Sequence, residues 1–222
     1  MAAVNDVAAG LERVRQRIVA AGGDLDRITL VAVTKGFGVD AARALRQAGI
    51  ADLGENYAQE LREKADALDD PGVRWHFVGR IQRNKVGLVG EDVHLWHGVD
   101  RPAVGDAIAR RAPGAAVLVQ VDVTGEPQKG GCPPDAAPEL VEQLTASGLH
   151  VRGLMAVGPA GAPEDARAGF RLVAALADDL ALAERSMGMS DDLEVAVEEG
   201  ATIVRIGRAL LGPRPVASRA RR

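Results

Sequence analysis

Eight short apolar runs alternate with amphipathic stretches along the chain, and this alternation constrains the fold more than any other feature. The runs lie at 28–35, 51–56, 73–79, 94–99, 115–123, 151–157, 185–189 and 202–207. Between them, apolar residues recur at spacings of three and four, which is typical of helices that bury one face. Strands that alternate with helices are usually parallel and joined by crossovers. The sequence therefore predicts an α/β protein built on a parallel sheet.

The number of runs favours a closed (β/α)8 barrel, the TIM barrel, with an open doubly wound sheet as the alternative. The runs are nearly all apolar, as expected for strands that are covered on both faces. Another amphipathic stretch at about 4–21 predicts an extra N-terminal helix. The 222 residues contain no linker, so we expect one domain over 1–222, with a basic, disordered tail from about 213 to 222.

Composition bears on partners and location. The net charge of −4 argues against a surface that recruits nucleic acid. Cys132 is the single cysteine, so no intrachain disulfide can form, which suits a reducing compartment. No run is long enough to span a bilayer, and charges interrupt the N-terminal stretch, unlike a signal peptide. We expect a cytoplasmic protein that binds neither nucleic acid nor membrane, and a monomer, because no long apolar stripe marks an interface.

Polar residues and glycines gather where the predicted strands end, which is the catalytic face of such a barrel. Ser186 and Ser190 flank Gly188 at the seventh run, and Arg205 and Gly207 lie in the eighth. Loops after strands 7 and 8 commonly bind phosphate, and helix N-termini favour anions. Tight turns without a ligand would use the same glycines, so the pattern alone leaves both interpretations open.

Lys35 ends the first run and is followed at once by a glycine. In a closed barrel the first strand adjoins the last, so Lys35 would lie beside the phosphate-type loops. A partly desolvated lysine has a lowered pKa, and its neutral amine can form a Schiff base with an aldehyde. Pyridoxal 5′-phosphate (PLP) requires such a pair of features, and Arg205 would then point at the cofactor ring. The alternative is a solvated cation at the end of a strand.

Several segments together resemble the pyridoxal phosphate homeostasis protein family. They read AVTKG, GENYAQE, WHFVGRIQRNK, GLMAVGP, SMGMSDDLEVAVEEGAT and VRIG, in this order, and the resemblance spans about residues 10 to 212. Members of this family are single-domain relatives of the barrel of alanine racemase. The resemblance implies that Lys35 holds PLP as an internal aldimine, that Arg205 faces the pyridine nitrogen and that Asn56 lies near the ring.

The resemblance also implies a phosphate site and its surroundings. Ser186, Ser190, Gly207 and the backbone at Arg208 would surround the phosphate, and Met155 and Met189 would pack around the site. Two positions depart from the family pattern. Arg208 replaces the usual threonine or serine, which removes a hydroxyl from the phosphate site, and Leu211 replaces a bulkier residue.

Three functions are weighed. The first is a carrier or buffer of PLP without substrate turnover, with apo forms of PLP enzymes as its recipients. Arginine opposite the ring nitrogen leaves that nitrogen unprotonated and weakens the ring as an electron sink. Alanine racemase also takes a tyrosine base from a second domain, which we do not find here; Tyr57 is the one tyrosine in the chain.

The second function is a weak PLP-dependent amino-acid racemase, and the third is a partner-binding barrel that holds no cofactor. No metal site is predicted, because no third ligand accompanies His94 and His97. We expect His76 to be a hydrogen-bonded core residue rather than part of the site.

Overall fold

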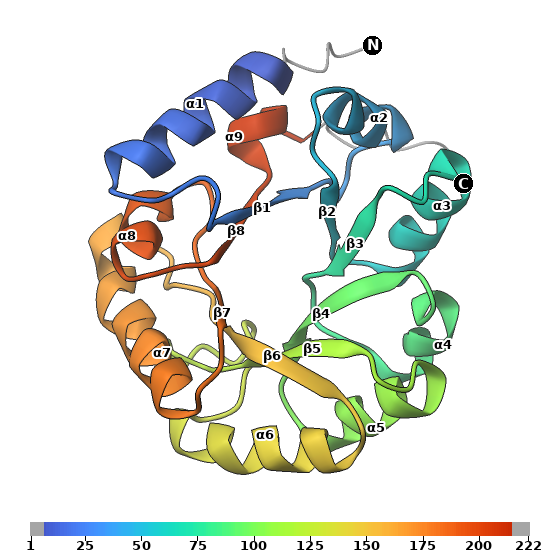
Figure 1. Cartoon of the computed structure of the whole chain (residues 1–222), viewed down its shortest axis with the longest axis vertical. Helices are drawn as coiled ribbons and strands as arrows, with labels where there is room; N and C mark the ends of the chain where they lie inside the picture. Colours follow the sequence, from blue (N-terminus) through green and yellow to red (C-terminus); the bar gives the residue numbers. More distant parts are fainter. Residues whose placement is uncertain (1–6, 215–222) are drawn as a thin grey trace.

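The computed structural model describes residues 7–214, and within this range the eight strands form a closed parallel barrel in chain order (Figure 1). The strands are β1 Thr29–Val33, β2 Asp52–Glu55, β3 Arg74–Phe77, β4 Val93–Val99, β5 Ala116–Gln120, β6 His150–Met155, β7 Glu184–Ser186 and β8 Ile203–Ile206. The first and last strands close the barrel, with Val31 opposite Arg205. The predicted (β/α)8 barrel is confirmed, and the open sheet is wrong.

The helices form a ring outside the barrel (Figure 1). They are α1 Val7–Ala20, α2 Val39–Gln47, α3 Ala58–Leu68, α4 Val86–Val89, α5 Pro102–Arg111, α6 Ala137–Ala146, α7 Arg167–Asp179, α8 Leu193–Glu198 and α9 Arg208–Leu211, with 3₁₀ turns at Arg83–Lys85, Pro134–Ala136 and Pro163–Ala166. The predicted N-terminal helix is α1, which packs against α8 and α9 near the seam between β1 and β8. No helix within residues 7–214 is long and apolar enough to cross a membrane.

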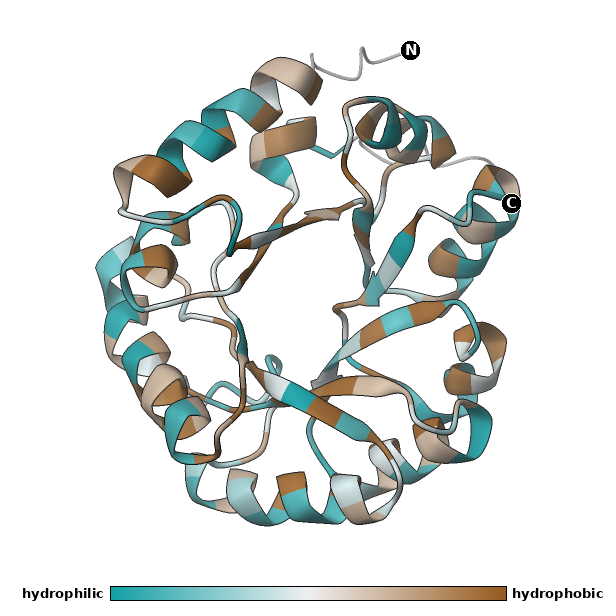
Figure 2. Cartoon of the chain, in the orientation of Figure 1, coloured by the Kyte–Doolittle hydropathy of each residue, from teal (hydrophilic) through white to brown (hydrophobic). Residues whose placement is uncertain are grey.

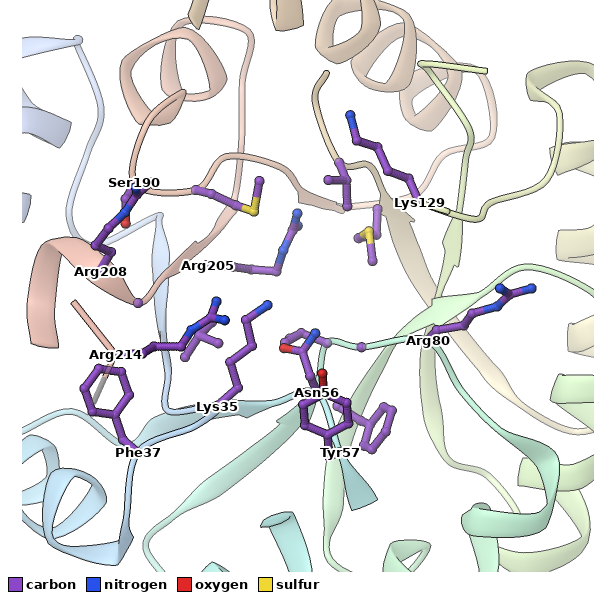
Figure 3. Close-up of a pocket in the computed structure, with 18 of the residues that line it drawn as sticks. Lys35, Phe37, Asn56, Tyr57, Arg80, Lys129, Ser190, Arg205, Arg208 and Arg214 are labelled. Atoms are coloured by element: carbon purple, nitrogen blue, oxygen red, sulfur yellow. The ribbon is translucent and has the colours of Figure 1, made fainter. Parts of the chain in front are cut away.

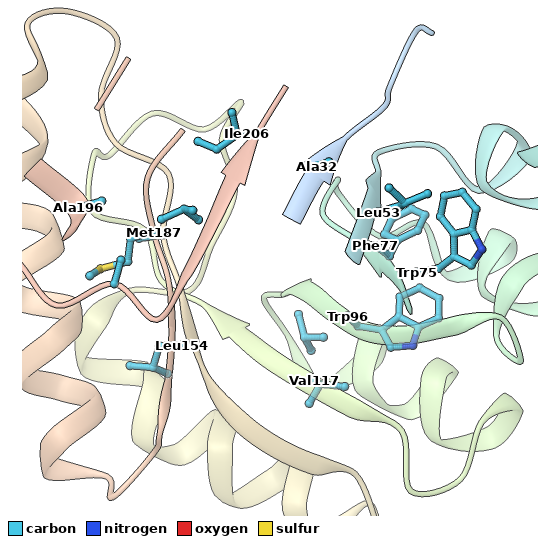
Figure 4. Packing of buried hydrophobic residues seen from close by; sticks show 14 of the residues in the cluster. Ala32, Leu53, Trp75, Phe77, Trp96, Val117, Leu154, Met187, Ala196 and Ile206 are labelled. Carbon is cyan, nitrogen blue, oxygen red and sulfur yellow. The ribbon is translucent and has the colours of Figure 1, made fainter. Parts of the chain in front are cut away.

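Apolar residues form the layer between strands and helices. Figure 2 shows the brown faces of the helices turned toward the barrel and the teal faces turned outward. Trp96, Phe170 and Leu53 are among the large side chains that are fully buried in the structure. Figure 4 shows Trp75, Phe77 and Trp96 together on the outer side of β3 and β4, and the rings of Phe77 and Trp96 lie 5.3 Å apart. This layer fixes the strands, and so fixes the backbone positions at their ends.

The barrel interior is more polar than its outer layer. A small apolar cluster of Val31, Leu95, Leu118, Met155 and Ile203 lies apart from the main core. Buried polar and charged residues of the strands face this interior: Asp52, His76, His97, Gln120, Ser186 and Arg205. Buried Thr34 and Glu55 instead face Lys64 of α3 in the outer layer. Except for β4, the observed strands are shorter than the apolar runs, because the last residues of several runs leave the sheet and form the rim of the barrel.

Candidate functional site

A pocket of about 910 Å³ opens at the carboxyl ends of the strands (Figure 3). It is lined by Lys35, just beyond the end of β1, by Asn56, just beyond β2, and by Arg205 of β8. Met155, Met189, Ser190, Gly207 and Arg208 also line it, so eight of the nine predicted site residues meet here. Figure 3 shows the side chains of Lys35 and Arg205 pointing into the same central space. The pocket therefore brings together side chains from both ends of the chain.

Lys35 lies just beyond β1 and is half-buried. Burial, followed by the neighbouring guanidinium groups of Arg214 and Arg205, lowers the pKa of Lys35. Its amine makes no hydrogen bond or ion pair with any residue in the described part of the chain. Gly36 follows with φ of 76°, a left-handed conformation that favours glycine, and turns the chain away from the strand. A free amine with a lowered pKa is a nucleophile available to a ligand.

Arg205 lies in the barrel interior, with 5% of its surface exposed. Its Nη1 donates to the backbone oxygen and the Oγ of Ser186, both at 2.7 Å, and its Nη2 donates to the backbone oxygen of Ala156 at 2.8 Å. Burial lowers the pKa of Arg205 to about 10, which leaves it charged at neutral pH. Hydrogen bonds to three oxygens fix the guanidinium group and offset part of its desolvation.

The rim beside Arg205 is built by the turn after β7 and the start of α9. Gly188 has φ of 89°, and a Cβ there would approach the Cβ of Ala196 to 2.5 Å, so only glycine fits this turn. Ser190 Oγ accepts a hydrogen bond of 3.1 Å from the backbone N–H of Ala209. The Arg208 side chain pairs with Asp191. The backbone of Arg208 therefore stays at the rim, whereas the charge of its side chain is directed to the carboxylate of Asp191.

Ser186 is the predicted site residue that the structure does not bring to the pocket. It is fully buried at the end of β7, below the rim, and its Oγ bonds Arg205 and His97. The placement of Ser186 around a phosphate is therefore corrected, and of the two serines only Ser190 lines the pocket. The physical reason is the short strand: β7 ends at Ser186, and the next three residues rise to the rim before Ser190.

Asn56 and the methionines border the same space. Asn56 Oδ1 is buried and has no hydrogen-bond partner among the residues that the structure describes. Met155 is buried and Met189 is partly exposed, and both line the pocket as expected. Tyr57 lies at the rim with 59% of its surface exposed. A buried carbonyl oxygen without a donor is costly, so Asn56 is ready to accept a hydrogen bond from a ligand.

Sequence reasoning missed two groups near Lys35. The buried carboxylate of Glu55 accepts hydrogen bonds from Thr34 and Lys64, and Lys64 also donates to the backbone oxygen of Thr34 at 2.8 Å. Arg214, which we expected in a solvated tail, lines the pocket. Residues 215–222 of the predicted tail lie outside the described residues. The sequence signal for Glu55 was an acid inside an apolar run, whereas nothing in the sequence distinguished Arg214 from the arginines that follow it.

His76 and His97 belong to the barrel interior, whereas His94 and His150 are exposed. His76 is buried and bonds Asp52 and His97, so it is the hydrogen-bonded core residue that we expected. Within residues 7–214, no group of three histidine, cysteine or acidic side chains is arranged to hold a metal ion. Lys129, on the loop after β5, lines the pocket, but its Nζ bonds Glu126 and the backbone oxygen of Gly158. Lys35 therefore differs from Lys129 in having its amine free of described partners.

Comparison with known proteins identifies the family. Residues 9–215 match the family model described as alanine racemase, N-terminal domain. The pyridoxal phosphate homeostasis protein of Deinococcus radiodurans is 44% identical over 92% of this chain and 98% of its own length. The protein of the same name from Pseudomonas aeruginosa is 42% identical over 91% of both chains.

Solved structures agree with this assignment. The PipY protein of Synechococcus elongatus, in a structure with PLP bound, superposes with a TM-score of 0.83 at 30% identity, covering 93% of this chain and all of that one. Alanine racemase of Clostridium difficile has the same fold, with a TM-score of 0.77 at 15% identity over 96% of this chain and 58% of its own. The chain belongs to the pyridoxal phosphate homeostasis protein family, on the barrel fold of the alanine racemase N-terminal domain.

Proposed function

We propose that this protein binds PLP through Lys35 and holds it as a carrier or buffer, without turning over a substrate. The observation that carries the proposal is the free, half-buried amine of Lys35, whose pKa is lowered by burial and by Arg214 and Arg205, in a pocket that also holds a fixed guanidinium group. A neutral amine is required for attack on an aldehyde. The PLP-bound structure of the PipY relative supports the choice of ligand.

The pocket residues fit the chemical groups of PLP. Lys35 Nζ would form a C=N bond with the aldehyde carbon, and the carbonyl oxygen would leave as water. The rim at Ser190, Gly207 and the backbone of Arg208 would hold the phosphate, and Arg205 would face the ring nitrogen. Arg80, Lys85 and Arg214 also line the pocket and add positive charge that suits a phosphate. Asn56 Oδ1, which lacks a donor among the described residues, suits a hydroxyl group near the ring.

Holding rather than catalysis is supported by Arg205. Arginine is a donor and gives up its proton poorly, so a ring nitrogen that faces it stays unprotonated. The ring then stabilises a substrate carbanion weakly, which disfavours racemisation and related reactions. The names of the relatives at 42–44% identity point to the same role. Apo forms of PLP enzymes are the recipients that this role requires.

The test is to map the lysine that carries the ligand. The purified protein is loaded with PLP, reduced with borohydride, digested and analysed by mass spectrometry. We expect a pyridoxyl group on Lys35, and a visible absorbance band that Lys35→Ala abolishes and Lys129→Ala keeps. A label confined to Lys85 or Lys129 would contradict the assignment of Lys35. A colourless wild type after addition of PLP would instead support a barrel that binds no cofactor.

Rapid racemisation of alanine or serine by the loaded protein would overturn the carrier role while leaving PLP binding intact. The two parts of the proposal therefore fail separately. The mapping experiment tests which lysine forms the bond to PLP, and the racemisation assay tests whether the bound PLP turns over a substrate.

A further inference from the structure

A continuous series of buried hydrogen bonds crosses the barrel interior and ends on Arg205. Asp52 Oδ1 lies 3.0 Å from His76 Nε2, and His76 Nδ1 lies 2.9 Å from His97 Nε2. His97 Nδ1 lies 2.9 Å from Ser186 Oγ, which accepts from Arg205 Nη1 at 2.7 Å. We call Asp52, His76, His97 and Ser186 the interior chain. Its members come from β2, β3, β4 and β7, so it joins strands that are far apart in the sequence.

The interior chain runs from one end of the barrel to the other. Asp52 is the first residue of β2, at the N-terminal end of the barrel, where Arg74 also binds it. Arg205 lies at the other end, where it lines the pocket. Asp52 is 8% exposed, His76 is 2% exposed, and His97 and Ser186 are not exposed. Buried polar groups of this kind are stable only when each donor has an acceptor.

The two ends of the interior chain fix the direction of its hydrogen bonds. Arg205 is a donor only. Burial opposes the charge of Asp52, but hydrogen bonds from His76 and Arg74 outweigh it and lower the pKa of Asp52 to about 2, so its carboxylate is an acceptor only. His76 must therefore donate from Nε2, and a neutral His76 accepts at Nδ1.

The remaining links follow in order. His97 then donates from Nε2 to His76 and accepts at Nδ1, and burial lowers the pKa of His97 well below its ordinary value, which keeps it neutral. Ser186 donates its hydroxyl proton to His97 and is left with its lone pairs toward Arg205. Every donor in the series points away from the pocket, toward Asp52.

The opposite arrangement leaves groups unpaired. If His97 carried its proton on Nδ1, Ser186 Oγ would face two donors, His97 and Arg205, and its own proton would have no acceptor in the interior chain. His76 would then donate from Nδ1 and turn a lone pair toward the carboxylate of Asp52, which is repulsive. An unpaired buried donor or two facing lone pairs each cost stability. One tautomer of each histidine thus satisfies the whole series.

Arg205 is the group that gains from this order. Ser186 and Ala156 take three of its five N–H donors, and the remaining donors have no acceptor within the described residues. Because Ser186 must accept, the guanidinium group cannot rotate without losing that bond. The unused donors are then held toward the pocket into which Arg205 points (Figure 3).

We propose that Asp52 is a positioning residue that acts through His76, His97 and Ser186 to fix the orientation of Arg205 toward a ligand in the pocket. Asp52 lies at the opposite end of the barrel from the pocket and does not line it. The effect on the ligand rests on the proposed function, whereas the tautomers of the histidines do not.

The first test needs no variant of the interior chain and no ligand. Nitrogen-15 spectra of the four histidine side chains at mildly alkaline pH distinguish protonated from unprotonated ring nitrogens. His94→Gln and His150→Gln assign the other two histidines. We expect His76 and His97 both to be protonated on Nε2 and unprotonated on Nδ1. A proton on Nδ1 of either ring in the wild type overturns the proposal.

The second test uses Asp52→Asn, with Arg74→Gln as its matched control. An asparagine can turn either its oxygen or its amino group toward His76, so it no longer imposes the direction. We expect the Nδ1 resonances of His76 and His97 to move toward the protonated range in Asp52→Asn, and to stay unchanged in Arg74→Gln, which keeps the carboxylate. Unchanged resonances in Asp52→Asn, or an equal change in Arg74→Gln, would refute the role of Asp52.

The third measurement tests whether the interior chain affects the binding of PLP. We expect the dissociation constant for PLP to rise about fivefold in Asp52→Asn, the effect of one weakened hydrogen bond, with a shifted absorbance band, and neither change in Arg74→Gln. If Asp52→Asn and the wild type have equal affinity for PLP and the same absorbance band, the positioning role of Asp52 is refuted and the proposed function is unaffected. If the wild type binds no PLP, the proposed function fails, and the tautomer measurements still decide whether Asp52 orders the interior chain.

Discussion

Lys64 and Glu55 form an ion pair that is almost completely withdrawn from solvent, beside the strand end that carries Lys35. Their side chains are 5% and 0% exposed. Lys64 also donates to the backbone oxygen of Thr34, the residue before Lys35. The pair therefore ties α3, β2 and the end of β1 together. The carboxylate of Glu55 also opposes part of the lowering of the Lys35 pKa.

Removing one member of this pair should be costly. Glu55→Ala leaves the buried ammonium group of Lys64 with Glu60, 3.4 Å away, as its remaining carboxylate, and we expect a loss of about 3 kcal/mol in the free energy of unfolding. Urea denaturation of the single variants and of Glu55→Leu/Lys64→Met measures the coupling. The double variant should be more stable than the sum of the single effects predicts. Additive effects would mean that the pair contributes little.

Lys64→Met should lower the free energy of unfolding by an amount that depends on pH. Burial is the largest influence on Glu55 and raises its pKa, while Lys64 opposes this rise. Without Lys64 the folded-state pKa of Glu55 rises further above its ordinary value of 4.5. Protonated Glu55 then stabilises the fold below the unfolded pKa, and this contribution is lost as the pH rises through the folded pKa. The deficit relative to wild type should thus be larger at pH 8 than at pH 4 in denaturation curves.

The contribution of Asp52 to stability should change with pH in the opposite direction. The pKa of Asp52 is about 2 in the folded protein and 3.8 ordinarily. The ionised carboxylate therefore contributes stability above the unfolded pKa, and that stability is lost as the pH falls toward 2. We expect Asp52→Asn to lose about 2 kcal/mol at neutral pH. Thermal denaturation at pH 7 and pH 3 should bring the curves of variant and wild type closer at the lower pH. A deficit that grows on acidification would contradict the assignment.

The reactivity of Lys35 should follow its lowered pKa. The neutral fraction of a lysine rises as the pH approaches its pKa, so the rate of PLP addition should increase with pH and level off below the ordinary lysine range. Arg214→Gln removes one cause of the lowered pKa and should shift this profile to higher pH. Arg208→Gln is the matched control, because its guanidinium group pairs with Asp191. Stopped-flow absorbance measures both profiles, and an equal shift in the two variants would exclude a specific effect of Arg214.

Tyr57 provides a test against catalysis. Its side chain is 59% exposed at the rim, and we expect Tyr57→Phe to leave both PLP affinity and the absorbance band unchanged. A racemase that used Tyr57 as its base would lose activity by orders of magnitude on this change. Chiral analysis of alanine after incubation with each loaded protein distinguishes the two cases.

Particular residues explain how far the sequence could be interpreted. The eight strands, and the position of Lys35 at the end of the first one, were predictable because the spacing of apolar residues and the order of the runs are visible in the sequence. Ser186 was misplaced because its distance from the rim depends on where β7 ends, which the apolar run at 185–189 did not reveal. His76 could be assigned to the core, but its bonds to Asp52 and His97 depend on the register between neighbouring strands. Arg214 lacked any signal, because its position follows from the path of the chain after α9.

The closure of the barrel between β1 and β8 determines when the pocket can form during folding. Lys35 and Arg205 lie far apart in the sequence, and they come from strands that pair only when the ring closes. A nascent or truncated chain that lacks β8 carries the amine without the guanidinium group. A ligand that needs both groups would therefore bind only after the barrel has closed, so its binding would report that the ring is complete.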